Sequence, residues 1–315
     1  MKNFRLHSKA SKLFLAILLN FLLLLISSCD NMGAFPFLFN EDNVDERYGG
    51  FKQLSENEIP SLPSDTDGIY TGLIVTDVHF GGWGFDKEEK NRFLEWMEKQ
   101  FQNEDKTKIP RFAICLGDSA DGGHRSEYEE FNSYFEEIKS MAKKYLGSSY
   151  EFKVYTVLGN HDLYNNGWEN WKKQVYPYTS SYFFTAKTDS SSAGISYYFL
   201  DSANGTLGKD QLNDFEKKIK NDKNPKLIFT HYPIYAGKSV QLVLLGDTIE
   251  RNRCLSLFAK NNVKMVFGGH SHSNFSHDLN DFSQENTTAL FRNGYCRLFT
   301  VNEKAGTVST RLIEY

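Results

Sequence analysis

The sequence predicts an α/β domain with a mostly parallel sheet covered by helices, and three observations support this. The chain has 315 residues, of which 40% are hydrophobic and 24% charged, so it can bury a sizeable core. From residue 69 onward, short runs rich in Val, Ile, Phe and Tyr end in polar turns that contain Gly. Stretches with helical periodicity separate several of these runs, and this alternation is typical of parallel sheets.

The pattern also predicts the individual elements in chain order. Six apolar runs are predicted to be buried strands, at residues 69–76, 112–116, 153–158, 195–200, 226–230 and 263–267. Four amphipathic stretches are predicted to be helices, at residues 87–100, 128–145, 211–219 and 248–260. The last two segments, 289–301 and 307–315, alternate between apolar and polar residues, which predicts a terminal hairpin.

The first 28 residues have the pattern of an export signal. Four basic residues precede an apolar run at 13–26, which is followed by Ser27 and Ser28. The run is shorter than the about 20 apolar residues that a membrane-spanning helix needs. An uncleaved membrane anchor remains the alternative interpretation of this segment.

Residues 26–29 resemble the bacterial lipobox. In that group of precursors the Cys, here Cys29, is diacylated and becomes the new N-terminus, and more than one acyl chain gives stable anchoring. The resemblance implies an exported protein anchored to a bacterial cell membrane on its periplasmic or cell-surface side. The alternative is an ordinary Cys near a simple cleavage site. Residues 29–65 are then predicted to be a tether, and residues 66–315 the folded catalytic domain.

Net charge and cysteine content limit the possible functions. Residues 1–28 carry four basic and no acidic residues, so without them the net charge falls from −4 to −8. An acidic protein is a poor binder of long nucleic acid, whereas a small phosphorylated substrate remains possible where metal ions supply positive charge.

Besides Cys29, the chain contains Cys115, Cys254 and Cys296. Their odd number and wide spacing do not indicate a disulfide framework, although Cys254 and Cys296 could pair.

Five predicted strands end in side chains that can bind metals. Alone, each of these turns is weak evidence, because Gly-Asp after a strand is usually a plain turn. Together they place five of the eight His at the carboxyl ends of successive strands, which lie at one edge in α/β folds. In chain order the residues are Asp77, His79, Asp118, Asp121, Asn160, His161, Asp162, His231, His270 and His272.

The mixture of Asp and His indicates the class of metal. Imidazole and carboxylate together suit Zn²⁺, Mn²⁺ and iron, whereas Ca²⁺ and Mg²⁺ prefer oxygen ligands alone. A carboxylate can bridge two ions that lie about 3.5–4 Å apart, and such a pair stabilises both the attacking and the leaving oxygen. The donor mixture therefore predicts a site for divalent ions, with Mn, Fe and Zn all open, and a carboxylate in it could bridge a pair of them.

This ordered set of motifs resembles the calcineurin-like metallophosphoesterase superfamily over roughly residues 69–275. The resemblance implies an α/β fold with a two-sheet β-sandwich flanked by helices and a metal site at the strand ends. It also implies that His161 donates a proton and that Asp162 orients it. The implied ligands of one ion are Asp77, His79, Asp118 and His272. The implied ligands of the other are Asp118 as the bridge, Asn160, His231 and His270.

The implied activity is hydrolysis of phosphate mono- or diesters through attack by a hydroxide held on the two ions. Gly122 stands where the protein Ser/Thr phosphatase branch has Arg, and Asp121 stands where the purple acid phosphatase branch has a Tyr ligand. A cyclic-nucleotide phosphodiesterase, a nuclease, and a non-catalytic surface-binding lipoprotein with a relic metal site remain alternatives. His124 and Arg125 are candidate substrate contacts, with a solvated helix start as the competing interpretation.

Overall fold

The computed structural model describes residues 43–82, 87–188, 193–237 and 244–315. The predicted export signal at 1–28, the predicted lipidation site Cys29 and the first part of the predicted tether lie outside these residues. None of the helices in the described ranges combines the length and the apolar character that a membrane crossing needs.

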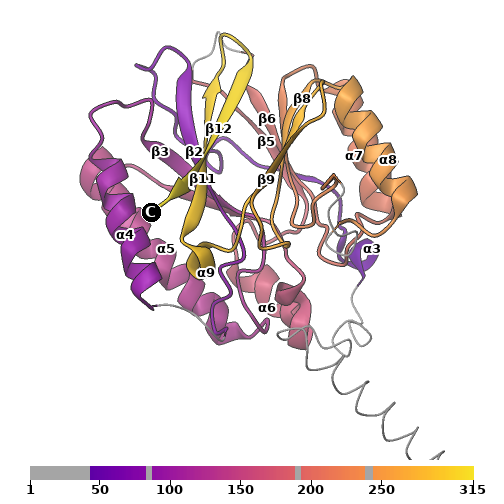
Figure 1. The fold of residues 1–315 in the computed structure, drawn as a ribbon, viewed down its shortest axis with the longest axis horizontal. Helices are drawn as coiled ribbons and strands as arrows, with labels where there is room; N and C mark the ends of the chain where they lie inside the picture. The colour runs from indigo at the N-terminus through magenta and orange to yellow at the C-terminus, as the bar shows by residue number, and fades with distance from the viewer. Residues whose placement is uncertain (1–42, 83–86, 189–192, 238–243) are drawn as a thin grey trace, which may run out of the picture. The chain divides into compact units, whose positions relative to one another are not determined.

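Two sheets lie face to face in the described part of the chain (Figure 1). In spatial order, the strands of the first sheet are β1 (Lys52–Gln53), β5 (Tyr182–Ala186), β6 (Ile195–Phe199), β7 (Lys226–Phe229), β8 (Val263–Gly268), β10 (Ser283–Asn286) and β9 (Phe275–Asp278). Those of the second are β12 (Thr307–Glu314), β11 (Tyr295–Asn302), β2 (Ile69–Val75), β3 (Pro110–Cys115) and β4 (Lys153–Thr156).

Both sheets are mixed, so the prediction of one mostly parallel sheet was wrong and the two-sheet sandwich is confirmed. Strands β2, β3 and β4 are parallel, as are β6, β7, β8 and β10. Strand β11 runs antiparallel to β2 and β12, β5 to β6, and β9 to β10. Alternation of strand and helix in a sequence predicts crossover units, but it does not reveal which sheet each strand joins.

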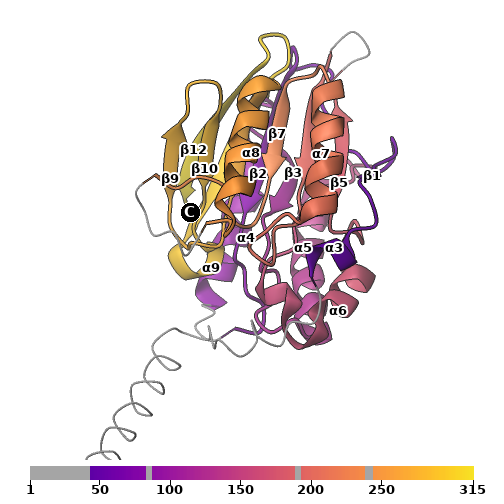
Figure 2. The ribbon, with the colours of Figure 1, turned by 90° about the vertical axis from the view of Figure 1, so that its right-hand side faces the viewer.

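Helices cover the outer faces of both sheets (Figures 1 and 2). Helices α4 (Lys87–Phe101) and α5 (Arg125–Leu146) pack on the second sheet, whereas α7 (Lys209–Asn221) and α8 (Thr248–Lys260) pack on the first. These four helices confirm the four that the periodicity predicted. Within the described ranges, the remaining helical segments are α3 (Val44–Arg47), η1 (His161–Asn166), α6 (Gly167–Gln174) and α9 (Leu290–Asn293).

An aromatic layer fills the space between the two sheets. The rings of Tyr197, Phe229 and Phe267 stack in sequence along the first sheet, with centroids 5.9 and 5.3 Å apart. The hydroxyl of Tyr197 lies 2.8 Å from that of Tyr70 on the facing sheet, so this buried polar pair is satisfied. Large rings bury much apolar area in few rotamers, and this layer therefore forms a rigid support for the strand ends.

Several elements had no clear signal in the sequence. Strand β10 contributes the buried polar side chains of Gln284, Glu285 and Asn286, so it lacks the apolar run by which buried strands are recognised. Residues 43–65, which the sequence suggested as the end of a tether, form α3 and β1, and β1 pairs with β5. The terminal hairpin is present as β11 and β12. Cys254 and Cys296 are buried free thiols, and so they do not pair.

Candidate metal centre

The predicted ligands lie where both sheets present the carboxyl ends of their strands. Strands β2, β3 and β4 of the second sheet and β7 and β8 of the first each lead into one of the loops that carry them. The loops come together because the two sheets pack face to face with these ends at the same edge. The structure thereby brings together residues that lie up to 195 positions apart, Asp77 and His272 being the outermost pair.

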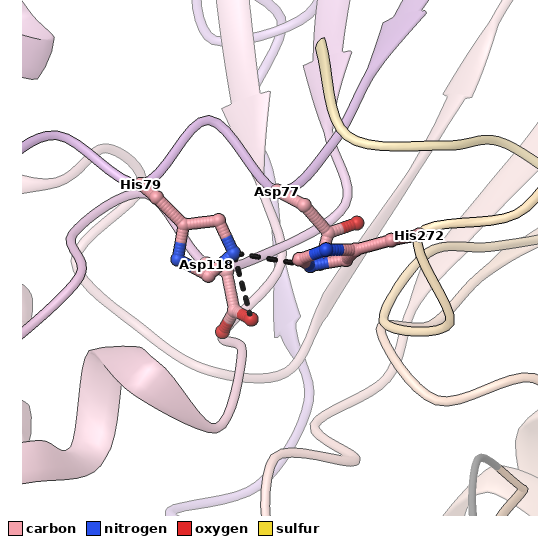
Figure 3. Close-up of side chains that lie close together, drawn as sticks. All are labelled: Asp77, His79, Asp118 and His272. Atoms are coloured by element: carbon pink, nitrogen blue, oxygen red, sulfur yellow. Dashed lines mark hydrogen bonds and ion pairs between the residues drawn. The ribbon is translucent and has the colours of Figure 1, made fainter. Parts of the chain in front are cut away.

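Four side chains form the first candidate cluster: Asp77, His79, Asp118 and His272. Each offers one ligand atom, and these atoms all lie within 4.8 Å of one another. Figure 3 shows the four side chains directed toward a common point. The Nε2 atoms of His79 and His272 are 3.2 Å apart, and Nε2 of His272 lies 3.3 Å from Oδ1 of Asp77. This is the arrangement expected of nitrogen and oxygen ligands around one ion.

Asp118 also belongs to a second cluster, with His231 and His270. Nε2 of His231 lies 3.3 Å from Oδ2 of Asp118 and 3.0 Å from Oδ1 of Asn160. The same Asp118 oxygen lies 3.7 Å from Nε2 of His79 in the first cluster. One carboxylate therefore stands between two groups of ligands, which is the position of a bridge between two ions.

The backbone at five candidate ligands is left-handed. The φ angles are 50° at Asp77, 45° at His79, 52° at Asp118, 61° at His270 and 48° at His272. Residues other than Gly rarely adopt this conformation, which costs on the order of 1–3 kcal/mol each and persists only where the surroundings impose it. Backbone hydrogen bonds join these loops, including one of 2.9 Å from the amide of His79 to the carbonyl of Asp118.

Two glycines allow the loops to approach closely. A Cβ atom on Gly159 would collide with the backbone nitrogen and carboxylate of Asp118. Gly117 has a φ of 99°, and a Cβ atom there would lie 2.6 Å from Nδ1 of His231. The loops after β3 and β4 can meet beneath Asp118 only because side chains are missing at these positions.

Protein hydrogen bonds hold the far side of two candidate ligands, Asp77 and His231. Oδ2 of Asp77 accepts from the Thr76 hydroxyl at 2.7 Å and from the His270 amide at 3.1 Å. Nδ1 of His231 donates to the carbonyl of Leu116 at 2.7 Å, which leaves Nε2 as the nitrogen with a free lone pair. Oδ1 of Asp77 is buried without a hydrogen-bond partner among the described residues. A cation in this position would satisfy it, so the residues present fit divalent metal ions.

Burial and neighbouring charges shift the pKa values of the candidate ligands. Burial raises the pKa of Asp77, but His272 and His231 together outweigh burial and the pKa falls to about 2. Burial lowers the pKa of His231, but the charge and hydrogen bond of Asp118, together with the charge of Asp77 and the bond to Leu116, outweigh it and raise the pKa to about 9. Burial, helped by the positive charge of His231, lowers the pKa of His270 to about 3. The carboxylates thus attract positive charge to this edge, and a divalent cation would take the place of protons there.

His161 lies beside the first cluster, and its ring contacts Asp121 rather than Asp162, the residue predicted to orient it. Its ring lies 4.5 Å from that of His79, and Nδ1 donates to the backbone carbonyl of Asp121 at 2.7 Å. Oδ1 of Asp121 lies 3.5 Å from the same nitrogen and 3.2 Å from Nδ1 of His79. The Gly-Asp-x-x-Asp spacing marked Asp121 as a candidate metal ligand, but nothing in the sequence indicated its contact with His161.

Asp162, predicted to orient His161, instead joins backbone loops. Its carboxylate accepts from the amides of Ser119, Ala120 and Gly159 at 3.3, 3.0 and 2.9 Å. Burial and the charge of Asp118 raise its pKa, while these donors oppose the shift. Asp162 therefore fixes the Asp118 loop against the Asn160 loop.

Neither predicted substrate contact joins the clusters. His124 is exposed where α5 begins, and Arg125 pairs with Glu129 at 2.8 Å with 77% of its side chain exposed. Tyr232 was not predicted, and its ring stacks on that of His270 with centroids 3.7 Å apart. Nothing in the sequence marked Tyr232 except its position after His231.

Comparison with known proteins gives a sequence match over most of this region. Residues 71–274 match the sequence profile of the calcineurin-like phosphoesterase family. A protein of Fibrobacter succinogenes (strain ATCC 19169 / S85), named as a probable cyclic nucleotide phosphodiesterase, is 33% identical over 90 residues. That match covers 28% of this chain and 35% of the relative, so the chain matches about a third of the relative's length.

Solved structures share the fold at low sequence identity. A dimetal phosphatase from Danio rerio matches with a TM-score of 0.54 and 13% identity, over 79% of this chain and 100% of its own. GAP50, the anchor in the inner membrane complex of Plasmodium, matches with a TM-score of 0.56 and 14% identity, over 78% and 85%. A purple acid phosphatase from yellow lupin matches with a TM-score of 0.50 and 15% identity, over 81% and 55%. The TM-scores establish a shared fold, whereas identities this low establish no shared activity.

We expect Asp118→Asn to remove both bound ions, because the shared carboxylate contributes to both clusters. The amide keeps the shape but loses the negative charge, so metal analysis after dialysis should fall from about two ions per chain toward none. Asp281→Asn, an exposed change of the same kind, should retain the metal content of the parent. Two ions in the Asp118 variant would show that this carboxylate is not the bridge.

Proposed function

The chain belongs to the calcineurin-like phosphoesterase family, and we propose that it hydrolyses phosphate mono- or diesters at a centre of two divalent metal ions. The observation that carries this proposal is the position of Asp118 between two clusters of His and Asp. Such a site can bind the substrate phosphate and a water molecule side by side, as hydrolysis requires.

The residues of the chain divide into those that would hold the ions and those that would act on substrate. Asp77, His79 and His272 would hold one ion, and Asn160, His231 and His270 the other, with Asp118 shared. Mn, Fe and Zn all suit this donor set. Bound ions would lower the pKa of a coordinated water toward about 7 and neutralise charge on the phosphate oxygens. The neighbouring hydrogen bonds keep the ligands in place while substrate binds.

His161 would donate a proton to the leaving group. Its Nδ1 faces the carbonyl of Asp121, which can only accept, so that nitrogen keeps its proton. The proton that is exchanged is therefore the one on Nε2. Burial lowers the pKa of His161, and the carboxylates of Asp118 and Asp121 oppose that shift. Negative charge on a bound phosphate would likewise favour the protonated ring.

A cyclic nucleotide is the second candidate substrate, since the Fibrobacter succinogenes relative is named for this activity. A cyclic nucleotide is a phosphodiester, and the same groups would serve its hydrolysis. A binding protein without activity is a further possibility for this fold, because GAP50 is an anchor protein. The complete set of candidate ligands favours the enzyme, since a binding protein does not need all of them.

We also propose that the mature protein is exported and held on a bacterial membrane through lipid on Cys29. The basic start, the apolar run at 13–26 and the lipobox-like residues 26–29 support this. The net charge of −8 without residues 1–28 supports a small phosphorylated substrate rather than long nucleic acid.

We expect hydrolysis of at least one phosphate ester when the protein is loaded with Mn²⁺, Zn²⁺ or Fe²⁺. A panel of p-nitrophenyl phosphate, bis-p-nitrophenyl phosphate and cyclic AMP separates monoesterase, diesterase and cyclic-nucleotide activity. Asp118→Asn protein prepared in parallel identifies any contaminating hydrolase. If the parent carries two ions and hydrolyses none of these, the binding protein becomes the better interpretation.

We expect His161→Ala to retain both ions while turnover falls by roughly 10²–10⁴-fold, the usual contribution of a general acid. The loss should be larger for alkyl phosphates than for p-nitrophenyl phosphate, because nitrophenolate leaves without protonation. His277→Ala is a control, since that ring contacts Tyr235 and Phe275 rather than the clusters. Equal losses on both substrates, or loss of an ion, would contradict the proton-donor role.

We expect Cys29→Ala to release the protein from membranes or to block its processing, because the acylated thiol is gone. Partitioning between detergent and aqueous phases, together with the mass of the mature chain, measures the change. Cys254→Ala removes a buried thiol and should partition like the parent. Identical partitioning and processing of the Cys29 variant and the parent would exclude lipidation there.

A further inference from the structure

Helix α3 is tied to the first sheet by a buried ion pair. Nε of Arg47 lies 3.0 Å from Oδ2 of Asp201, and Nη2 lies 3.0 Å from Oδ1, so the guanidinium bonds both oxygens. Neither side chain is exposed. Nη2 also donates to Oδ1 of Asn204 at 2.6 Å. A planar, doubly bonded pair of this kind fixes direction as well as distance.

The loop that Arg47 holds, residues 201–204, follows β6 and is fixed at its start. The amide of Asp201 donates to Oε1 of Gln211 at 2.9 Å, and Nε2 of Gln211 donates to the Asp201 carbonyl at 2.8 Å. Oδ1 of Asp201 accepts in addition from the amide of Ala203 at 3.1 Å. The position of Ser202, between these bonds, is thus determined by Arg47 and Gln211.

Ser202 in turn holds the second cluster. Its hydroxyl oxygen accepts from the amides of His231 and Tyr232, each at 3.0 Å, and its side chain is completely buried. His231 is a candidate ligand of the second ion, and the ring of Tyr232 lies against His270, another candidate ligand. One hydroxyl therefore positions two neighbouring residues that carry or support this cluster.

The first cluster has different supports. Thr76 and the amide of His270 hold Asp77, and the carbonyl of His272 accepts from the hydroxyl of Thr288 at 2.6 Å. Ser202 makes none of these contacts. The series of contacts from Arg47 through Asp201 to Ser202 thus supports the second cluster and not the first.

We infer that Ser202 and Arg47 are positioning residues for the second metal site, and that the segment at 43–47 is a built-in support of that site. The inference rests on the proposed function only in taking the two clusters as metal sites. Removing the Ser202 hydroxyl leaves the amides of His231 and Tyr232 without their acceptor. The backbone of His231 is then held less firmly, although its Nδ1 still bonds to the carbonyl of Leu116. Removing Arg47 leaves the buried Asp201 carboxylate without its charged partner, so the loop keeps only its bonds to Gln211 and within itself.

Binding of Mn²⁺ to metal-free protein tests this inference in two backgrounds that separate the sites. His272→Ala impairs the first cluster, and His270→Ala impairs the second. In the His272→Ala background, Ser202→Ala should weaken Mn²⁺ binding roughly 10–100-fold, the usual effect of losing such an outer contact. In the His270→Ala background, the same change should leave Mn²⁺ affinity within about a factor of two, because Ser202 does not support the first cluster.

Ser196→Ala is the matched control. Ser196 is completely buried at the other end of β6, and its hydroxyl accepts from Nδ2 of Asn224 at 3.1 Å. Its loss should lower the melting temperature about as much as the loss of Ser202, without changing Mn²⁺ affinity. Unchanged affinity in Ser202→Ala, or equal weakening by both serine changes, would overturn the positioning role.

Arg47→Lys tests the contact between Arg47 and Asp201. The risk to folding is small because Lys keeps the positive charge, but Lys cannot bond both oxygens of Asp201. It should weaken Mn²⁺ binding in the His272→Ala background and not in the His270→Ala background. If only Ser202→Ala has this effect, the role of the segment at 43–47 is refuted. If the parent binds no Mn²⁺, the proposed function fails instead.

Discussion

The two oxygens of Asp118 have separate tasks. Oδ1 accepts from the amide of His161 at 2.9 Å, whereas Oδ2 faces His231 at 3.3 Å and His79 at 3.7 Å. A carboxylate that is fixed on one side and open on the other can serve two ions without moving. Nearly every other feature of the site keeps this carboxylate in place or brings candidate ligands toward it. Examples are the turn at Gly159 and the three hydrogen bonds from backbone amides to the carboxylate of Asp162.

This arrangement opposes local backbone preference, so the rest of the fold must stabilise it. Five candidate ligands adopt left-handed φ angles, at a cost on the order of 1–3 kcal/mol each. The free energy that offsets this cost comes from the aromatic layer between the sheets and from the helix-covered outer faces. A stacked core also moves little when its surface loops are strained, which preserves the geometry for metal binding.

The supports of the two clusters differ in where they come from. The first cluster is held by Thr76 and by Thr288, which lie beside its own ligands in the structure. The second is connected through Ser202 and Asp201 to Arg47, near the beginning of the described chain. Residues 43–54 therefore belong to the folded domain in a physical sense, although their composition resembles a linker. A segment of this kind is stabilised by a few long-range contacts rather than by its own periodicity.

The sequence by itself determined the types of the candidate ligands, their order and their placement at strand ends, since these depend on local patterns that each strand carries alone. It also indicated the four long helices, because their apolar stripes repeat with the helical period. Only the tertiary structure decided how strands divide between two sheets, because pairing is a long-range choice that local pattern does not encode. It likewise decided that Asp121 rather than Asp162 contacts His161, because this contact joins two loops whose approach depends on how the strands pack. The Arg47–Asp201 pair joins residues 154 positions apart, and only the folded backbone makes such partners neighbours.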